Sequence, residues 1–317
     1  MTIDYPFAAQ LEGAEALVTY TYLIDETGQI ANIQITQLLG EDVFESEIIE
    51  WLEKKSFSPA LLNGKRIESW ELQKRVFLID GRTRGARRNF VVRWKRFIRK
   101  LGEGDYDAAN EYMLKMEEVS DRSLYEELYL QHAAATLALA QAERSKAYHH
   151  LQNLNSLMIY PFGKQGGLIG PADLYYNLLL EKYQIEAELL LLGDAMVTRN
   201  ALRELSPESE NTLIVEEHLA GLLEMVSGKE YQVDARLDSS IYSNSEGGWG
   251  TWLASNSFTL SNVEGRLRRI ILDCDGGQLL LETSEGGPLE VPKGWGACRL
   301  ILLGDLGTTL KLSQRRQ

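Results

Sequence analysis

The chain has 317 residues, of which 44% are hydrophobic and 25% are charged, ordinary proportions for a soluble globular protein. Its formal net charge of -13 argues against broad nucleic-acid binding, because such binding depends on Lys and Arg side chains that neutralise phosphates. No stretch of about 18 uncharged apolar residues exists, so the sequence predicts no transmembrane span.

The first residues, MTIDYPFAAQLEG, have neither the basic start nor the apolar core of a signal peptide. We therefore expect either a cytoplasmic chain or a periplasmic chain from which a leader or membrane anchor has been removed.

Residues 1–82 change their hydrophobic period in a way that predicts a small β-β-α-β domain. Apolar side chains alternate with less apolar ones in residues 18–24 and 30–35, which is typical of half-buried strands. The next segment has the period of an amphipathic helix, and a third strand is expected over residues 70–79. The apolar face of that helix would consist of Phe44, Ile48 and Leu52.

Residues 83–228 have a helical pattern rich in Leu, Ala and Glu. The segments 102–105 and 193–194 resemble turns between paired helices, in which Gly closes one helix and Asp starts the next. The pattern predicts an array of tetratricopeptide-like helical hairpins that bury a shared core and leave a groove. A plain irregular helical bundle would give the same periodicity.

Residues 229–317 consist of short apolar runs separated by Gly-rich turns, which is typical of an all-β sandwich or small barrel. The chain is therefore predicted to be a multi-domain α+β protein. Its domains would be a β-β-α-β domain over 1–82, a helical array over 83–228 and a small all-β domain over 229–317.

Both cysteines of the chain, Cys274 and Cys298, lie in this last segment. Each stands beside a Gly-rich turn, and we predict that they form one disulfide, as is usual in an oxidising compartment. The alternative is that they are two buried free thiols.

No motif in the sequence indicates catalysis. A Walker loop, a Rossmann fingerprint, a Cys-rich zinc pattern and a nucleophile elbow are all absent from it. His149 and His150 are adjacent, so on a helix they would point about 100° apart and would not easily share a metal ion. We predict a protein that is not an enzyme and that has no catalytic residues, no cofactor and no metal site.

Nine Lys or Arg residues and no Asp or Glu stand between Arg82 and Lys100, and subtracting them from -13 leaves -22 for the rest of the chain. One interpretation is an amphipathic helix that contacts an anionic membrane surface or an acidic partner through residues 87–100. In the other, the apolar stripe packs on the next helices and the basic face pairs with their glutamates. The basic face would consist of Arg93, Lys95, Arg96, Arg99 and Lys100, and the stripe of Phe90, Trp94, Phe97, Ile98 and Leu101.

Several spaced motifs of residues 5–80 occur together in the order of a known family. They are Tyr5-Pro6, Gly13-Ala14-Glu15-Ala16-Leu17-Val18, Asp25 to Ile30, Phe57-Ser58-Pro59-Ala60 and Asn63-Gly64-Lys65. Together they make this segment similar to the C-terminal domain of TonB-type energy transducers, over about a quarter of the chain. Ala16 stands where the family has a second glycine.

The resemblance implies that the last strand is a sheet edge, which in the family accepts a short extended segment from an outer-membrane receptor. In such strand addition, main-chain hydrogen bonds give affinity and alternate side chains give specificity. The partner-binding residues would be Tyr5, Pro6, Glu71, Gln73, Arg75, Val76 and Phe77. Alternatively, the apolar residues of this strand belong to the core and the edge is covered.

The function expected from these features is that of a periplasmic adaptor. It would bind protein segments, from an outer-membrane receptor or an envelope complex, at the TonB-like edge or in the helical groove. A first alternative is a truncated energy transducer for outer-membrane transport. A second is a carbohydrate-binding or enzymatic protein acting through the C-terminal β domain, which exposure of Trp249, Trp252 and Trp295 on one face would favour.

Overall fold

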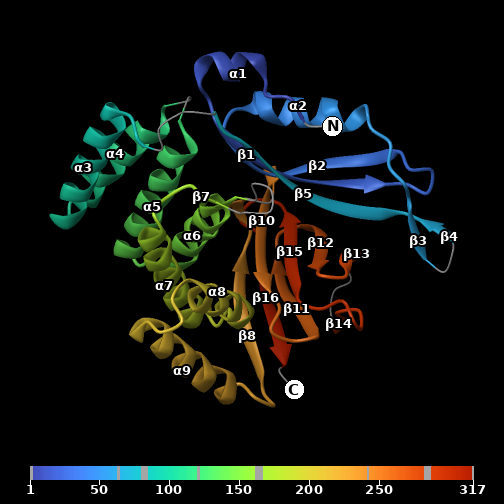
Figure 1. Ribbon diagram of the computed structural model, residues 1–317. Helices are drawn as coiled ribbons and strands as arrows, with labels where there is room; N and C mark the ends of the chain where they lie inside the picture. Colours follow the sequence, from blue (N-terminus) through green and yellow to red (C-terminus); the bar gives the residue numbers. More distant parts are fainter. Residues whose placement is uncertain are drawn as a thin grey trace. The chain divides into compact units, whose positions relative to one another are not determined.

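The structure is a computed structural model that describes residues 3–62, 65–79, 85–119, 122–160, 167–240, 243–281 and 287–315 (Figure 1). The chain divides into two compact units, one formed by Met1–Thr19, Leu38–Lys55 and Gln73–Leu178 and the other by Tyr20–Gln37, Ser56–Leu72 and Leu179–Gln317. This division does not test the predicted domain boundaries after residues 82 and 228, which stay predictions. Among the described helices, none is both long and apolar enough to cross a bilayer.

The N-terminal segment contains the predicted β-β-α-β succession. Its strands form a three-stranded sheet of order β2-β1-β5, and a short hairpin, β3–β4, precedes β5. The hairpin and the short first helix were not predicted, and the turn predicted at Asn63–Gly64 lies outside the described residues. The elements are α1 (Phe7–Glu12), β1 (Ala16–Ile24), β2 (Ile30–Leu39), α2 (Asp42–Glu53), β3 (Ala60–Leu62), β4 (Lys65–Ile67) and β5 (Ser69–Phe77).

The core of this segment lies between α2 and the sheet. Phe44, Ile48 and Leu52 of α2 are fully buried, as the helical period predicted. On the central strand β1 the predicted row, Val18, Tyr20, Tyr22 and Ile24, is buried, and the other row is buried in part, at Leu17 and Thr21. The polar residue Thr21 of this strand is small and β-branched, so it is buried without difficulty and conceals the burial in the sequence pattern.

The middle of the chain forms paired helices. Contacts join α3 to α4, α4 to α5, α5 to α6, and α8 to α9. Asp105 caps α4 by accepting a hydrogen bond from the amide of Ala108 (3.3 Å), and Gly104 has the positive φ that the preceding turn requires. These helices and a short strand pair are α3 (Arg88–Gly102), α4 (Tyr106–Glu117), α5 (Leu124–Ala140), α6 (Arg144–Met158), β6 (Ile159–Tyr160), β7 (Gly167–Leu168), α7 (Ala172–Glu188), α8 (Leu192–Leu205) and α9 (Glu210–Met225).

The predicted turn at Gly193–Asp194 is placed differently in the structure. α8 already begins at Leu192, and the chain reverses just before it, where Leu190 has a φ of 56°. Gly193 lies in the first turn of α8, where a Cβ would come 1.9 Å from the carbonyl oxygen of Trp252. The glycine therefore permits a close approach of α8 to the C-terminal sheet and does not end a helix.

The C-terminal residues form two antiparallel sheets, as the turn spacing predicted for an all-β segment. One sheet has the order β13-β12-β15-β10-β9 and the other β14-β11-β16-β8. On β8, buried Tyr231, Val233 and Ala235 alternate with exposed residues, so one face of its sheet is covered. The strands are β8 (Glu230–Arg236), β9 (Asp238–Ser240), β10 (Ser243–Trp252), β11 (Ser257–Glu264), β12 (Leu267–Cys274), β13 (Gly277–Leu281), β14 (Leu289–Glu290), β15 (Cys298–Gly304) and β16 (Thr309–Arg315).

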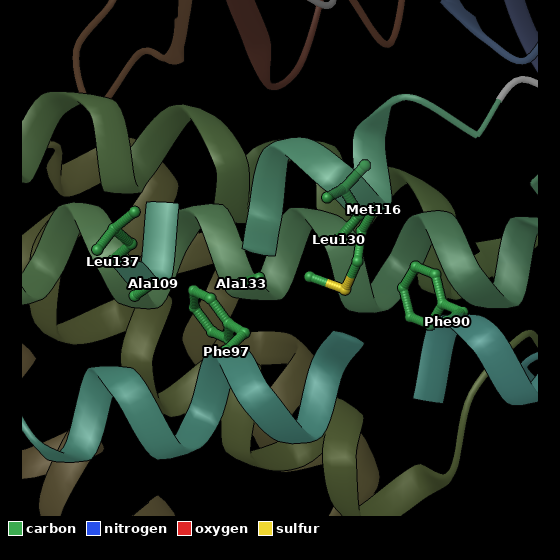
Figure 2. Packing of buried hydrophobic residues seen from close by; sticks show 7 residues of the cluster. All are labelled: Phe90, Phe97, Ala109, Met116, Leu130, Ala133 and Leu137. Atoms are coloured by element: carbon green, nitrogen blue, oxygen red, sulfur yellow. The ribbon is translucent and has the colours of Figure 1, made fainter. Parts of the chain in front are cut away.

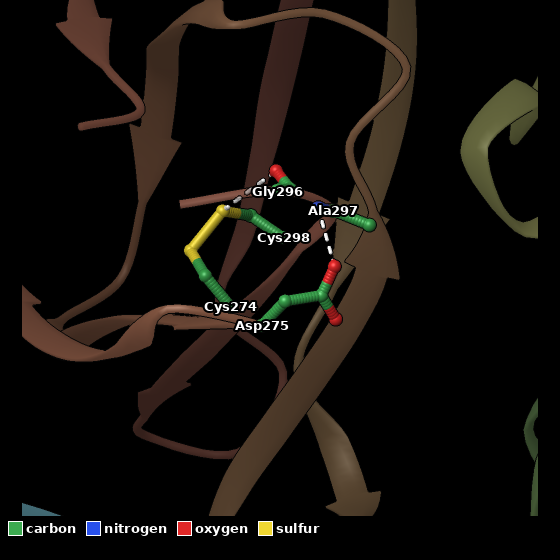
Figure 3. Close-up of a disulfide and its surroundings, with 5 residues drawn as sticks. All are labelled: Cys274, Asp275, Gly296, Ala297 and Cys298. Atoms are coloured by element: carbon green, nitrogen blue, oxygen red, sulfur yellow. Dashed lines mark hydrogen bonds between the residues drawn. A yellow bond between two sulfur atoms is a disulfide. The ribbon is translucent and has the colours of Figure 1, made fainter. Parts of the chain in front are cut away.

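The predicted disulfide between Cys274 and Cys298 is present (Figure 3). The two residues are directly opposite each other at the ends of the neighbouring strands β12 and β15. Asp275 follows the first cysteine and accepts a hydrogen bond from the amide of Ala297 (3.0 Å) through its carboxylate. The end of this strand pair is therefore held both by the disulfide and by a side-chain hydrogen bond.

Candidate partner-binding edge

β5 forms one edge of the N-terminal sheet, as the resemblance to TonB-type domains implied. Within the described part of the chain its hydrogen-bonded neighbour is β1, and β2 forms the opposite edge. Glu71 and Gln73 are exposed, Arg75 and Val76 are half-buried, and Phe77 is buried. The candidate edge therefore has an exposed first part and a largely buried last part.

Tyr5 and Pro6 belong to the packing of the domain. The ring of Tyr5 lies edge-on to the rings of Phe44 and Phe77, with 5.7 Å between ring centroids in both pairs. Its hydroxyl group donates a hydrogen bond to the carbonyl oxygen of Ala14, and Pro6 is buried. The role of these two residues in the structure is thus to hold the start of the chain on the core, and their contact with a partner stays a prediction.

The start of the chain is also attached to the last part of β5. The guanidinium group of Arg75 donates a hydrogen bond from Nη2 to the carbonyl oxygen of Ile3 (3.2 Å). Burial lowers the pKa of the neighbouring Lys74 to about 8. The most accessible described side chains of the edge are therefore those of Glu71 and Gln73.

Two of the family-like motifs meet at the β1–β2 turn. The carboxylate of Asp25 accepts hydrogen bonds from the hydroxyl group of Thr27 (2.7 Å) and from the amides of Gln29 (2.9 Å) and Thr27 (2.8 Å). These bonds, first that of the hydroxyl group, hold the pKa of Asp25 below its usual value. Gly28 has a φ of 89°, and a Cβ there would come 2.0 Å from the carbonyl oxygen of Phe57. The amide of Phe57 in turn donates to the carbonyl oxygen of Gly28 (2.7 Å). These two motifs thus contact each other in the structure, one in the β1–β2 turn and the other in the segment before β3.

The missing second glycine of the strand-entry motif has a structural counterpart. A Cβ atom on Gly40 would come within 2.6 Å of the methyl group of Ala16. Gly40 also has a φ of 130°, a conformation that other residues rarely adopt. The close approach of the two chain segments is therefore made at Gly40, with Ala16 on the other side.

Glu15 has a structural role that the sequence did not reveal. It is buried, and its carboxylate accepts hydrogen bonds from the amide of Leu124 (3.0 Å), the first residue of α5, and from the amide of Ile79 (3.4 Å). A negative charge is favourable at the N-terminus of a helix, where backbone N–H groups lack partners. The only signal for this role in the sequence is a carboxylate between Ala14 and Ala16.

The basic segment forms helix α3, and its apolar stripe packs as one of the two interpretations predicted. Phe90 and Phe97 are buried, and Trp94 and Leu101 pack against the same cluster. The ion pairs of the basic face lie at the end of α3 itself, where Lys100 contacts Glu103 (2.8 Å) and Asp105 (3.1 Å). Arg99 also contacts Glu103, whereas Arg93 donates to the carbonyl oxygen of Lys115 and Arg96 lies over the ring of Tyr112.

A groove lies between α7 and α9 in the second unit, with a volume of about 510 Å³. Its walls are mainly apolar, and Ile214 is 56% exposed. Two of its lining residues contact each other, since the hydroxyl group of Tyr183 lies 2.9 Å from Nδ1 of His218. The lining residues include Leu180, Ala187, Ile214, Val215 and Leu222.

The three tryptophans of the C-terminal segment are each half-buried. Trp249 and Trp252 are three positions apart on β10, so their side chains point to opposite faces of the strand. Trp295 packs on the turn before β13, where a Cβ on Gly276 would come 2.9 Å from its Cα atom. The arrangement that would favour carbohydrate binding, three exposed rings on one face, is not what the structure has.

No three His, Cys, Asp or Glu side chains of the described residues are grouped so that they could hold a metal ion. The most perturbed carboxylate is Glu186, which is fully buried beside Lys182 and whose pKa is raised to about 7 by burial. Lys182 also donates to the hydroxyl oxygen of Thr198 (2.9 Å), so this pair joins α7 to α8. That the protein is not an enzyme stays a prediction.

Comparison with known proteins identifies the N-terminal segment. Residues 1–77 match the family model described as Gram-negative bacterial TonB protein C-terminal, so this part of the chain is a TonB C-terminal domain. The solution NMR structure of the Pseudomonas aeruginosa TonB CTD is 27% identical, covering 26% of this chain and 87% of that chain, with a TM-score of 0.23. A search of curated proteins finds no match. The protein thus carries a TonB-like domain, a domain type that acts in the Gram-negative periplasm and makes contacts with envelope proteins.

Proposed function

We propose that the protein is a non-catalytic periplasmic adaptor, whose TonB-like domain binds an extended protein segment along β5. The observation that carries this proposal is the position of β5 at the sheet edge, with Glu71 and Gln73 exposed. An edge strand presents unpaired N–H and C=O groups, which a second extended strand pairs with directly.

The geometry limits the length of the bound segment. Because Arg75 and Phe77 already hold the start of the chain, the partner would pair with residues 69–73. At about 3.3 Å per residue, this part of the strand spans about 17 Å and accommodates a segment of about five residues. A cationic side chain in the partner would suit Glu71.

The proposal is tested by removing single N–H groups from β5 in the full chain. Successive residues of a strand direct their backbone groups to opposite sides, so one of the variants Leu72→Pro and Gln73→Pro breaks the pairing with β1 and the other removes an outward N–H group. We expect one variant to lose stability and the other to remain folded but to lose capture of its envelope partner. A folded variant that captures as much partner as the wild type would contradict strand addition.

The groove between α7 and α9 supports a second binding surface of the same adaptor. The groove has a mainly apolar lining in which Glu188 is the acidic residue. The segment that forms it, residues 172–225, contains eleven Asp or Glu and three Lys or Arg, a net charge of -8. These features suit an amphipathic helix with a basic outer face. Ile214→Asp should abolish binding of such a helix, whereas Leu213→Asp, at an equally exposed neighbour outside the groove, should leave binding unchanged.

A further inference from the structure

α3 concentrates positive charge in a chain that is otherwise acidic. Its 15 residues include six Lys or Arg and no Asp or Glu. Subtracting these six from the formal charge of -13 leaves -19 for all other residues. The helix is about 22 Å long at 1.5 Å per residue, so these cations extend over several turns.

Four residues of the apolar stripe of α3, Phe90, Trp94, Phe97 and Leu101, pack within the protein itself, whereas Ile98 stays exposed. Phe90 and Phe97 pack into a cluster with residues of α4 and α5, as Figure 2 shows. Trp94 lies edge-on to Tyr129 at 5.2 Å between ring centroids and 5.9 Å from the ring of His132. The orientation of α3 on its neighbours is therefore set, and the opposite face is directed outward.

The outward face combines cations with an exposed apolar residue. Arg88, Val92, Lys95 and Arg99 follow one another at steps of four, three and four residues and are all exposed, which makes one stripe along the helix. Val92, at its centre, is 43% exposed, and Ile98 at its margin is 44% exposed. In the described part of the chain, no ion pair involves Arg88 or Lys95, in contrast to Lys100 with Glu103 and Asp105.

We propose that this outward face of α3 binds an anionic phospholipid surface. The guanidinium and ammonium groups would contact lipid phosphates, and Val92 would enter the headgroup region between them. An anionic bilayer repels the remaining charge of -19 and attracts the cations of α3. The protein would therefore approach the bilayer with this face of α3. The contact is independent of β5 and places no requirement on its partner.

A lipid layer fits this face better than an acidic protein does. The cations are spread along a stripe with no acidic residue between Arg88 and Gly102, and an apolar residue stands at its centre. An extended layer of identical phosphates offers a partner to each cation at once, and its apolar boundary accepts Val92. An acidic polypeptide would satisfy the charges but not the exposed valine.

The test is co-sedimentation of the full chain with vesicles of phosphatidylglycerol mixed with phosphatidylcholine, and with vesicles of phosphatidylcholine alone. We expect binding to the anionic vesicles only, which high salt abolishes. The double variant Arg88→Gln/Lys95→Gln should weaken that binding about 30-fold, and Val92→Ser should weaken it less. Lys229→Gln/Lys293→Gln removes two exposed charges elsewhere and should bind as the wild type does.

Three results would overturn the proposal. They are the absence of binding to anionic vesicles, equal binding to neutral vesicles, and binding that the Arg88/Lys95 variant retains. A parallel measurement with polyglutamate distinguishes the other partner class. Binding to polyglutamate without binding to anionic vesicles would assign the face to an acidic polypeptide and contradict a lipid contact.

Discussion

Glu15 shows how one side chain links a domain to the segment that follows it. Its carboxylate accepts hydrogen bonds from Leu124 at the start of α5 and from Ile79 just after β5. Glu126 likewise links α5 to the residue before α3. It belongs to the capping box of α5 and also accepts three hydrogen bonds from the side chain of Arg87. Although burial opposes this, these bonds keep the pKa of Glu126 below its usual value. Two carboxylates thus place the start of α5 within the first unit.

Gly193 provides a test of close packing between α8 and β10. Its backbone is helical, so alanine fits the conformation, but the added Cβ would lie 1.9 Å from the carbonyl oxygen of Trp252. We predict that Gly193→Ala lowers the free energy of unfolding by about 3 kcal/mol, the upper part of the range for overpacking. The measurement is chemical denaturation followed by circular dichroism.

The matched control for this variant is Gly221 in α9, where a Cβ would meet no atom within 4 Å. Gly221→Ala should raise the free energy of unfolding by about 0.5–1 kcal/mol, because alanine loses less backbone entropy in a helix. Equal effects of the two substitutions would show that α8 does not approach β10 as closely as described.

At the scale of elements, the helix pair α5–α6 is expected to respond to acid. His150 of α6 lies 2.9 Å from the side-chain oxygen of Gln131 of α5, and burial, with the nearby charges of His149 and Lys146, lowers its pKa to about 3. The unfolded chain takes up this proton near pH 6.5, so acid favours the unfolded chain between pH 6.5 and pH 3. The contribution of His150 to stability is complete above pH 6.5 and is lost as the pH falls.

We therefore predict that His150 alone lowers the free energy of unfolding by about 1–2 kcal/mol between pH 7 and pH 5. This value is reduced for screening by solvent, because the ring is partly exposed. His150→Gln keeps a hydrogen-bonding group beside Gln131 and should remove this share of the loss. Glu186 acts in the opposite direction, because its raised pKa of about 7 makes its contribution decline as the pH rises from 4.5 through 7. The informative quantity is therefore the difference between variant and wild type in urea denaturation at the two pH values. No difference between them would contradict the buried neutral state of His150.

The elements that the sequence predicted well are those whose signal is local. The helical period of Phe44, Ile48 and Leu52 and the turn at Asp25–Gly28 depend on residues that are close in sequence. The cysteine pair depends on two neighbouring strands of one segment. The role of Gly193 could not be predicted from its neighbours in sequence. A glycine is needed there because the backbone of Trp252, on a strand distant in sequence, lies against it.

The candidate site was predictable to the same extent. The edge position of β5 was implied by the resemblance to TonB-type domains, and β5 lies at the edge of its sheet. That Tyr5 packs on Phe44 and Phe77 could not be predicted, because it depends on which distant residues meet around one ring. The burial of Leu17 and Thr21 in the second row of β1 was missed for the same reason.

At the scale of the whole molecule, the chain joins a TonB C-terminal domain to paired helices and to two antiparallel sheets. Three surfaces on it are suited to partners of different chemistry. The edge of β5 suits an extended segment, the α7–α9 groove suits a helix, and the outward face of α3 suits an anionic lipid layer. An adaptor that holds envelope components together would use such distinct surfaces at the same time.

The most direct test of this account is site-specific photo-crosslinking at β5 in a Gram-negative envelope. A photoreactive residue replaces Gln73 in the full chain, and the control places it at Asn32, which is also exposed but lies on the opposite edge strand, β2. If a partner strand adds to β5, position 73, and not position 32, crosslinks to an extended segment of an envelope protein. Equal crosslinking at the two edges, or none at position 73 while the folded protein still captures its partner, would contradict strand addition at β5.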